Sequence, residues 1–158
     1  MKILMVCLGN ICRSPLAEGI LKDKVSKAGL DWVVESAGTT SYHIGEPPHE
    51  FSRKVARMHG IDISKQRARK YVRTDMLEFD KIYAMAEDVM YDIKKISGEN
   101  YDNKKVELFL NELYPGQDMD VPDPWYGPEA GYLEAYELID RACNALIENY
   151  MITTKQIS

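Results

Sequence analysis

The N-terminal residues constrain the fold of this chain more than any other segment. Lys2–Cys7 is an apolar run that ends shortly before Gly9. Its length is typical of a strand that is buried on both faces, as strands in parallel sheets are. Residues 15–27 then carry apolar side chains at helical spacing, and Ser14 followed by Pro15 suits an N-cap and a first turn. This opening predicts a strand, a tight loop and a helix.

The same alternation continues along the chain. Further strands are predicted at residues 32–37, 81–86 and 106–110, and further helices at residues 49–59, 88–96 and 131–150. Loops are predicted at residues 38–48 and 115–131, and a polar tail from about residue 153 is expected to fray. Strands that alternate with helices indicate an α/β fold whose parallel sheet is covered on both faces. Such folds bind ligands at the carboxyl ends of the strands, where the loop after Cys7 belongs.

Length, charge and cysteine content argue against several classes of protein. A chain of 158 residues is expected to form one domain, residues 1–158. The net charge of −5 argues against nucleic-acid binding, and the sequence has neither a membrane-spanning run nor a signal-peptide pattern. Three cysteines and three histidines without zinc-ligand spacing argue against a disulfide scaffold and a structural zinc site. We therefore expect a reduced, cytoplasmic protein that binds neither nucleic acid nor membranes and holds no metal.

The loop between Cys7 and Ser14 has the residue types of an anion-binding site. Gly9 and Asn10 tolerate positive φ, which lets a strand-to-helix turn point successive backbone N–H groups into one concavity. The helix that follows adds the positive end of its dipole, and Arg13 offers a guanidinium fork to two phosphate oxygens. Cys7 would lie at the bottom of this positive bowl, which favours the nucleophilic thiolate. The loop therefore predicts a phosphate site that also activates the attacking sulfur.

Two other interpretations of this loop agree less well with the sequence. The ATP-binding pattern Gly-x4-Gly-Lys-Ser/Thr is absent from the sequence. The spacing Cys-x5-Arg-Ser/Thr arises by chance in roughly one chain in a hundred of this composition, so alone it carries a moderate risk of a false match. The alternative is a buried Cys7 at a strand end with a solvated Arg13, but it leaves Gly9-Asn10 and Ser14-Pro15 unexplained. The strand before the loop and the helix after it favour the phosphate site.

The loop resembles the signature of a known enzyme family. The segment Val6-Cys7-Leu8-Gly9-Asn10-Ile11-Cys12-Arg13-Ser14-Pro15 is similar to the phosphate loop of the low-molecular-weight protein tyrosine phosphatases. Matching segments from Lys2 to about Tyr150 include Glu35-Ser36-Ala37-Gly38, Tyr42-His43-Ile44-Gly45, Arg67-Ala68-Arg69, Phe79-Asp80 and Asp123-Pro124-Trp125-Tyr126-Gly127. The resemblance implies a three-layer α/β/α fold with a central four-stranded parallel sheet. It also implies hydrolysis of phosphotyrosine without a metal or other cofactor, through a cysteinyl-phosphate intermediate.

Asp123 is the candidate general acid. A tyrosine leaving group, with a pKa of about 10, leaves poorly as an anion, so a proton donor typically contributes about 10²–10⁴ in rate. Asp123 stands between Pro122 and Pro124, which stiffen its loop. These residues alone do not distinguish it from an ordinary turn Asp before Pro. The resemblance assigns it to the family's catalytic Asp-Pro pair.

By the same resemblance, Tyr42 and Trp125 wall a deep slot, with Tyr126 beside them. Leu8 and Ile11 line its mouth from the phosphate loop. Aromatic faces hold a phenyl ring, and a deep slot would leave phosphoserine short of the sulfur. The alternative is that these aromatic residues are ordinary exposed loop side chains.

Supporting roles follow from other matched positions. Asn10, Ser14 and Ser36 match family positions whose side chains hold the phosphate loop open, although Ser14 also suits an N-cap. Gln66 stands where many relatives have His, so we expect loop support through hydrogen bonds without charge. Ala86 stands where many relatives have Asp, which predicts different electrostatics around the acid loop.

The remaining cysteines, histidines and basic residues carry weaker signals. Cys12 lies five residues after Cys7, a position suited to a reversible disulfide that protects Cys7 after peroxide attack; the alternative is a small packed residue. Cys143 is expected in the core. The three histidines, His43, His49 and His59, are expected at the surface or as caps. The basic residues within 64–73 form either a solvated face or a region that attracts phosphopeptides.

The sequence predicts a protein tyrosine phosphatase with the catalytic residues Cys7, Arg13 and Asp123. Its expected partners are phosphotyrosine-containing proteins, and we expect a monomer or a weak dimer. One alternative on the same fold is an arsenate reductase, which needs further cysteines that are absent between Cys12 and Cys143. Another is a protein arginine phosphatase, which typically has Thr where Ile11 stands. A phosphate-binding or phosphocarrier domain would hold a phosphocysteine without hydrolysing it, and Asp123 argues against that.

Overall fold

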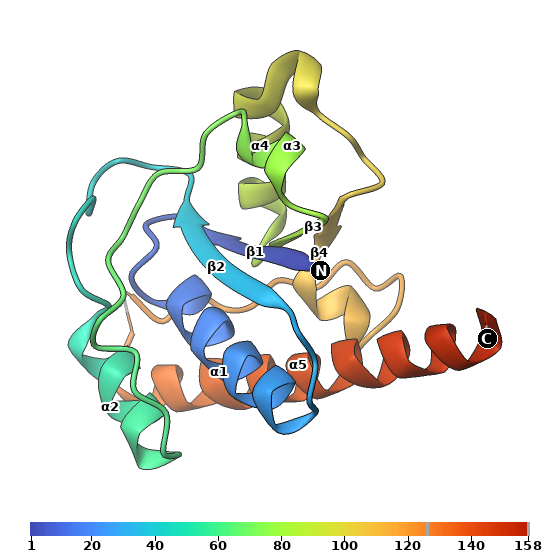
Figure 1. The fold of residues 1–158 in the computed structure, drawn as a ribbon. Helices are drawn as coiled ribbons and strands as arrows, with labels where there is room; N and C mark the ends of the chain where they lie inside the picture. Colours follow the sequence, from blue (N-terminus) through green and yellow to red (C-terminus); the bar gives the residue numbers. More distant parts are fainter. Residues whose placement is uncertain (126, 158) are drawn as a thin grey trace.

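The structure, a computed structural model, describes residues 1–125 and 127–157. Its sheet has four strands: β1 (Lys2–Cys7), β2 (Val33–Gly38), β3 (Lys81–Ala84) and β4 (Val106–Leu108). They lie in the order β2-β1-β3-β4, and every neighbouring pair is parallel (Figure 1). The predicted four-stranded parallel sheet is therefore confirmed.

Helices cover both faces of this sheet and make the predicted three layers. They are α1 (Arg13–Lys27), α2 (Glu50–Met58), α3 (Asp75–Glu78), α4 (Glu87–Ser97) and α5 (Ala130–Ile157). Two 3₁₀ turns, η1 (Gly98–Asn100) and η2 (Phe109–Glu112), follow α4 and β4. In Figure 1, α1, α2 and α5 lie on one side of the sheet, and α3 and α4 lie on the other.

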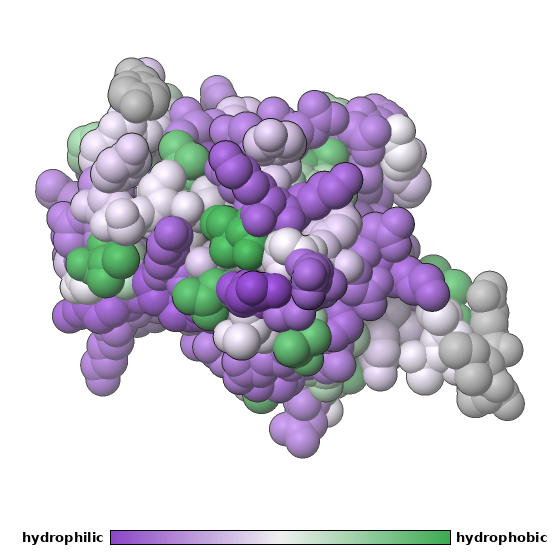
Figure 2. Space-filling model, turned by 90° about the horizontal axis from the view of Figure 1, so that it is seen from above, coloured by the Kyte–Doolittle hydropathy of each residue, from purple (hydrophilic) through white to green (hydrophobic). Residues whose placement is uncertain are grey.

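Strand β1 shows why the sequence begins with an unbroken apolar run. Ile3, Met5 and Cys7 belong to the core packed against α1 and α5, whereas Leu4 and Val6 belong to the core packed against α3 and α4. Successive side chains of a strand point to opposite faces, so a central strand covered on both sides needs apolar residues at every position. The outer surface on the side of α3 and α4 shows hydrophobic residues as separate small patches among hydrophilic ones (Figure 2).

Among the element boundaries that differ from the prediction, three have a visible local cause. Helix α1 begins at Arg13 rather than Pro15, and its N-cap Cys12 makes no side-chain cap, so Ser14 is not the N-cap. Strand β3 ends at Ala84 because Ala86 has become the extended N-cap of α4. Strand β4 ends at Leu108, where the chain turns into η2.

The C-terminal tail is helical, so the prediction that the last helix ends at residue 150 was wrong. Helix α5 continues to Ile157. The hydroxyl of Thr153 donates to the Asn149 carbonyl, and that of Thr154 donates to the Tyr150 carbonyl, each at 2.9 Å. These bonds satisfy polar side chains along the helix, so a polar tail does not have to leave it. Across residues 1–125 and 127–157, no helix combines the length and the apolar character that a membrane span requires.

Candidate active site

The loop between β1 and α1 is held tightly against the end of β2. Asn10 adopts φ 59°, whereas Gly9, which was also expected at positive φ, does not. The loop packs directly on Gly38, where a Cβ would lie 2.8 Å from the Leu8 carbonyl oxygen and 2.9 Å from the Asn10 nitrogen. The N–H and hydroxyl of Thr40 both donate to the Leu8 carbonyl at 3.0 Å. The fold therefore fixes this loop before any ligand arrives.

Cys7 ends β1 at the floor of this loop and is almost fully buried, with 3% of its surface exposed. The Asn10 backbone N–H donates to Cys7 Sγ at 3.3 Å, and Ser14 Oγ lies 3.0 Å from the same sulfur. Donors aimed at sulfur stabilise its negative charge, which is what a thiolate nucleophile requires.

Asn10 connects the floor of the loop to β2 and to the segment after α2. Its Nδ2 donates to Ser14 Oγ at 2.8 Å and to Ser36 Oγ at 3.0 Å. Its Oδ1 accepts from the backbone N–H of Arg69 at 3.0 Å. The structure thus brings Asn10, Ser14 and Ser36 into one buried network that ends on Cys7.

The outer end of this network is a carboxylate that the sequence analysis did not identify. Ser36 Oγ donates to Glu18 Oε1 at 2.6 Å, and Lys22 Nζ lies 2.7 Å from Glu18 Oε2. Glu18 is buried on α1, four residues after Ser14, so both side chains share one face of the helix. That spacing was the signal available in the sequence.

Gln66 does not occupy the place expected for it in this network. Its Nε2 donates to the Pro15 carbonyl at 3.1 Å, which ties it to the first turn of α1. Its Oε1 is buried and has no hydrogen-bond partner within the described parts of the chain. The Asn10 side chain is held by the Arg69 backbone N–H instead. Arg69 is itself fixed, because its Nη1 and Nη2 donate to the two carboxylate oxygens of buried Asp75 at 3.0 and 3.2 Å. At least this member of the basic stretch is structural.

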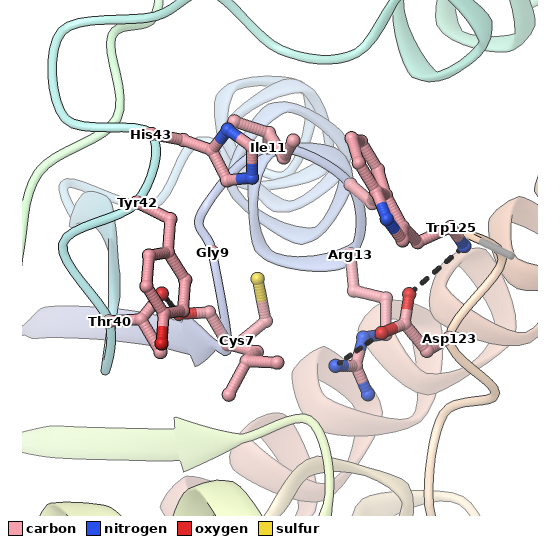
Figure 3. Close-up of a pocket in the computed structure, with 11 residues that line it drawn as sticks. Cys7, Gly9, Ile11, Arg13, Thr40, Tyr42, His43, Asp123 and Trp125 are labelled. Atoms are coloured by element: carbon pink, nitrogen blue, oxygen red, sulfur yellow. Dashed lines mark hydrogen bonds and ion pairs between the residues drawn. The ribbon is translucent and has the colours of Figure 1, made fainter.

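Arg13 and Asp123 lie next to each other on one side of the pocket. Arg13 Nη2 lies 3.6 Å from Asp123 Oδ2, and its Nη1 donates to the Val121 carbonyl at 3.1 Å (Figure 3). The Val121 N–H donates to the Met85 carbonyl, which anchors the acid loop to the residues that follow β3. Asp123 Oδ1 accepts from the Trp125 N–H at 3.1 Å. The residue after Met85 is Ala86, which has no carboxylate to offer Arg13. The charge partner of Arg13 is therefore Asp123.

One pocket gathers the predicted catalytic side chains and both predicted walls (Figure 3). It is lined by Cys7, Leu8, Gly9, Ile11, Cys12, Arg13, Thr40, Tyr42, His43, Asp123 and Trp125. Tyr42 and Trp125 stand on opposite sides of Cys7, and their exposed fractions are 82% and 40%. The predicted wall residue Tyr126 lies outside the described residues.

His43 is a pocket residue that the sequence analysis expected at the surface or as a cap. Its Nδ1 pairs with Glu46 Oε2, and its ring centroid lies 5.4 Å from that of Trp125. The ring covers Gly9, where a Cβ would lie 3.0 Å from His43 Cδ2, and the other ring nitrogen faces the pocket in Figure 3. Residue 9 is therefore glycine because a side chain would crowd this ring, and not because the backbone needs positive φ. His49, in contrast, is a cap as expected, because its Nδ1 accepts from the Phe51 N–H at the start of α2.

Cys12 lines the same pocket as Cys7, and both sulfurs are free. Its Sγ lies 3.7 Å from the hydroxyl of Tyr132 on α5. Burial raises the pKa of the Cys12 thiol to about 12, while the hydrogen bond from Tyr132 acts in the opposite direction. Cys143 is fully buried in the core. In the described part of the chain, no group of three or more His, Cys, Asp or Glu side chains is arranged to hold a metal ion.

Comparisons with known proteins agree with this geometry. The family model described as "Low molecular weight phosphotyrosine protein phosphatase" matches residues 2–156. A low molecular weight phosphotyrosine protein phosphatase from Gallus gallus is 37% identical over 149 residues, which are 92% of this chain and 93% of that protein.

Solved structures show the same likeness over nearly the whole chain. A protein tyrosine phosphatase from Entamoeba histolytica, with Hepes in its active site, superposes with a TM-score of 0.89 at 35% identity, covering 98% of this chain and 99% of that one. The Drosophila arginine phosphatase DARP superposes with a TM-score of 0.88 at 31% identity, covering 95% and 98%. Because the family model matches residues 2–156 and a relative is 37% identical over 92% of this chain, the chain belongs to the low molecular weight phosphotyrosine protein phosphatase family.

Proposed function

We propose that this protein hydrolyses phosphotyrosine in cytoplasmic proteins, with Cys7 as the nucleophile and Asp123 as the general acid. The observation that carries the proposal is a single pocket. It places the Cys7 sulfur at its floor, Arg13 and Asp123 on one side, and aromatic side chains at its rim. The free state of all three cysteines supports a reducing location.

In the first step, the Cys7 thiolate attacks phosphorus and the bond to the tyrosyl oxygen breaks. The loop N–H groups and Arg13 bind the equatorial oxygens as negative charge spreads over them. Asp123 gives its proton to the departing oxygen. The Asp123 carboxylate interacts with Arg13. A phosphate dianion that binds Arg13 therefore releases Asp123, which can then take up a proton from solvent and act as the acid.

In the second step, water attacks the phosphocysteine, and the same carboxylate removes the proton from that water. Cys7 now leaves as a thiolate. Ser14 Oγ at 3.0 Å and the Asn10 N–H at 3.3 Å are placed to stabilise it. The two polar groups at the sulfur therefore support both the attack and the release.

The rim supports phosphotyrosine over phosphoserine. A phenyl ring between Tyr42 and Trp125 would gain aromatic contacts, and its length would carry phosphorus down to the sulfur. In phosphoserine the phosphorus lies much closer to the peptide backbone. The backbone would therefore contact the rim before the phosphorus reached the Cys7 sulfur.

Phosphoarginine is the second candidate substrate, because the Drosophila arginine phosphatase has a closely similar fold. Ile11, which lines the pocket, argues against it, since that branch typically has Thr there. An arsenate reductase is less well supported because Cys143 is buried in the core, away from the pocket lining. A phosphocarrier is less well supported because Asp123 stands in the pocket, where it can activate water.

One experiment separates these candidates. We expect the wild-type protein to turn over phosphotyrosine peptides with kcat/KM well above that for matched phosphoserine and phosphoarginine peptides. We expect Ile11→Thr to shift the preference toward phosphoarginine. Equal cleavage of phosphoserine and phosphotyrosine would contradict the substrate assignment, and a single stoichiometric transfer would indicate a phosphocarrier.

We also propose that Cys12 protects Cys7 through a reversible disulfide. Both sulfurs belong to the same short loop and line the same pocket. Without a second thiol, oxidised Cys7 would proceed to irreversible acids. We expect Cys12→Ser to keep most activity but to lose recovery by added thiol after peroxide treatment. Equal recovery of the wild-type and Cys12→Ser proteins would contradict this role.

A further inference from the structure

The hydroxyl of Tyr132 reaches Cys12 from the far end of the sequence. Tyr132 lies in the first turns of α5, 120 residues after Cys12, and only 1% of its surface is exposed. Its ring stacks on His49 at 5.0 Å and meets Phe51 edge-on at 5.4 Å. These contacts fix the ring, so the hydroxyl is held 3.7 Å from Cys12 Sγ.

Packing alone does not account for that hydroxyl. A phenylalanine ring at the same position would make the same contacts with His49 and Phe51. Among the described residues, the hydrogen-bond contact of the Tyr132 hydroxyl is with Cys12 Sγ. A buried hydroxyl is costly unless it has a partner, so the pair between oxygen and sulfur needs a reason of its own.

The reactivity of the Cys12 thiol offers a reason for the Tyr132 hydroxyl. A cysteine attacks as the thiolate, and burial raises the pKa of Cys12 to about 12. A hydroxyl that donates to the sulfur stabilises the thiolate and partly offsets that burial. Burial also raises the pKa of Tyr132, so its phenol keeps its proton and remains a donor.

We propose that Tyr132 is a positioning residue for the disulfide between Cys7 and Cys12, through a hydrogen bond from its hydroxyl to Cys12 Sγ. This inference rests on the protective role proposed for Cys12. A peroxide first oxidises the Cys7 thiolate to a sulfenic acid and is itself reduced to an alcohol or water. The Cys12 thiolate then attacks the Cys7 sulfur, the S–S bond forms and the S–O bond breaks. The departing hydroxide combines with the proton that Cys12 lost, and Tyr132 keeps its own proton throughout.

The test compares Tyr132→Phe with Tyr136→Phe. Tyr136 lies one turn further along α5, is also buried, and stacks on His59 at 4.0 Å, so it controls for the loss of a buried phenol from the same helix. Each protein is treated with hydrogen peroxide. Disulfide formation and sulfenic acid, trapped with dimedone, are followed by mass spectrometry over a range of pH.

We expect Tyr132→Phe to form the disulfide about two- to tenfold more slowly than wild type, the effect of losing one hydrogen bond. Sulfenic acid should accumulate, and the rise of the rate with pH should move to higher pH, because the Cys12 thiolate has lost its donor. Steady turnover of phosphotyrosine peptides should stay within about twofold of wild type, since Tyr132 is not among the residues that line the pocket. Tyr136→Phe should match wild type in every measurement.

Three results would overturn the inference: equal disulfide rates in Tyr132→Phe and wild type, a faster rate in Tyr132→Phe, or equal slowing in both tyrosine variants. The last would assign the effect to helix packing rather than to the hydroxyl. If the wild-type protein itself forms no disulfide, the protective role of Cys12 fails, and this outcome is distinguishable because it appears before any tyrosine is changed.

Discussion

The floor and the rim of the pocket are built in opposite ways. On the floor, Cys7, Asn10, Arg13 and Ser14 are all buried. Hydrogen bonds connect Asn10 to Cys7, to Ser14 and to Ser36 on β2, and Arg13 donates to the Val121 carbonyl. At the rim, Tyr42 is almost fully exposed, and Trp125 packs against two imidazole rings. We therefore expect the floor to bind the phosphate group of every substrate and the rim to select the group attached to that phosphate. Changes to the floor should affect every substrate, and changes to the rim should affect substrates selectively.

The largest effect is expected at the floor, from Cys7→Ser. A serine hydroxyl is not ionised near neutral pH, so turnover should be abolished for every substrate. Because the rest of the loop is unchanged, calorimetric titration with phosphate should still show binding, and the fold should be intact. Steady turnover by the purified variant would contradict a covalent mechanism on Cys7.

Asp123 lies where floor and rim meet, so its effect should depend on the leaving group. Asp123→Asn should slow aryl phosphates with poor leaving groups by about 10²–10⁴, because they need a proton as they depart. Good leaving groups should lose much less. The measurement is kcat across a series of aryl phosphates, and an equal loss along the series would show that Asp123 is not the acid.

The same variant should also bind inorganic phosphate more tightly than wild type. Asp123 interacts with Arg13 at 3.6 Å, and a neutral amide would compete less with phosphate for that guanidinium. Phosphate affinity measured by calorimetry would show weaker binding instead if Asp123 contributes to holding the anion.

Asn10 has two roles on the floor that substitutions can separate: its backbone adopts positive φ, and its side-chain amide makes hydrogen bonds. Asn10→Gly keeps the freedom to adopt φ 59° but removes the amide, which leaves buried partners unpaired and should cost about 1–3 kcal/mol in the free energy of unfolding. Asn10→Ala should cost about 1–2 kcal/mol more, because it also forces a side chain with no local hydrogen bond into the left-handed region.

Urea unfolding measures both Asn10 variants. Asn111→Ala is the matched control, since Asn111 bonds Asp118 in an exposed pair. Equal stability of Asn10→Gly and wild type would show that the network does not hold the loop.

The smallest effects are expected at the rim. Tyr42→Ala and Trp125→Ala should each lower kcat/KM for phosphotyrosine peptides about three- to tenfold, because each removes one aromatic contact with the phenyl ring. Inhibition by inorganic phosphate should not change. Tyr91→Ala serves as the control, because Tyr91 is also an exposed tyrosine but lies on α4, away from the residues that line the pocket. A parallel loss of phosphate binding in the wall variants would break the division between floor and rim.

The difference between floor and rim also explains what could be predicted from the sequence. The sheet and the loop after β1 follow local patterns: β1 is apolar from Ile3 to Cys7 because these residues are covered on both faces, and Cys7, Arg13 and Ser14 lie within one short segment. Helix α3 was missed because Asp75–Glu78 is too short to show a helical period.

Contacts between distant segments could not be predicted in this way. His43 enters the pocket because Glu46 holds its ring over Gly9, which depends on the path of an exposed loop. Gln66 donates to the Pro15 carbonyl rather than bonding Asn10, since the Arg69 backbone N–H already donates to the side-chain Oδ1 of Asn10. Glu18 is the exception, because its spacing of four from Ser14 was visible in the sequence.

The most direct test of the mechanism looks for phosphate on the nucleophile. The Asp123→Ala protein, in which hydrolysis of the intermediate should be slow, is mixed with p-nitrophenyl phosphate, whose good leaving group needs no proton as it departs, and is quenched in acid within the first turnover. Mass spectrometry of the fragment that contains Cys7 should then show one added phosphoryl group on Cys7, and the same fragment from a Cys7→Ser protein should show none. Phosphate on any other residue, or first-turnover release of product without phosphate on Cys7, would contradict the account.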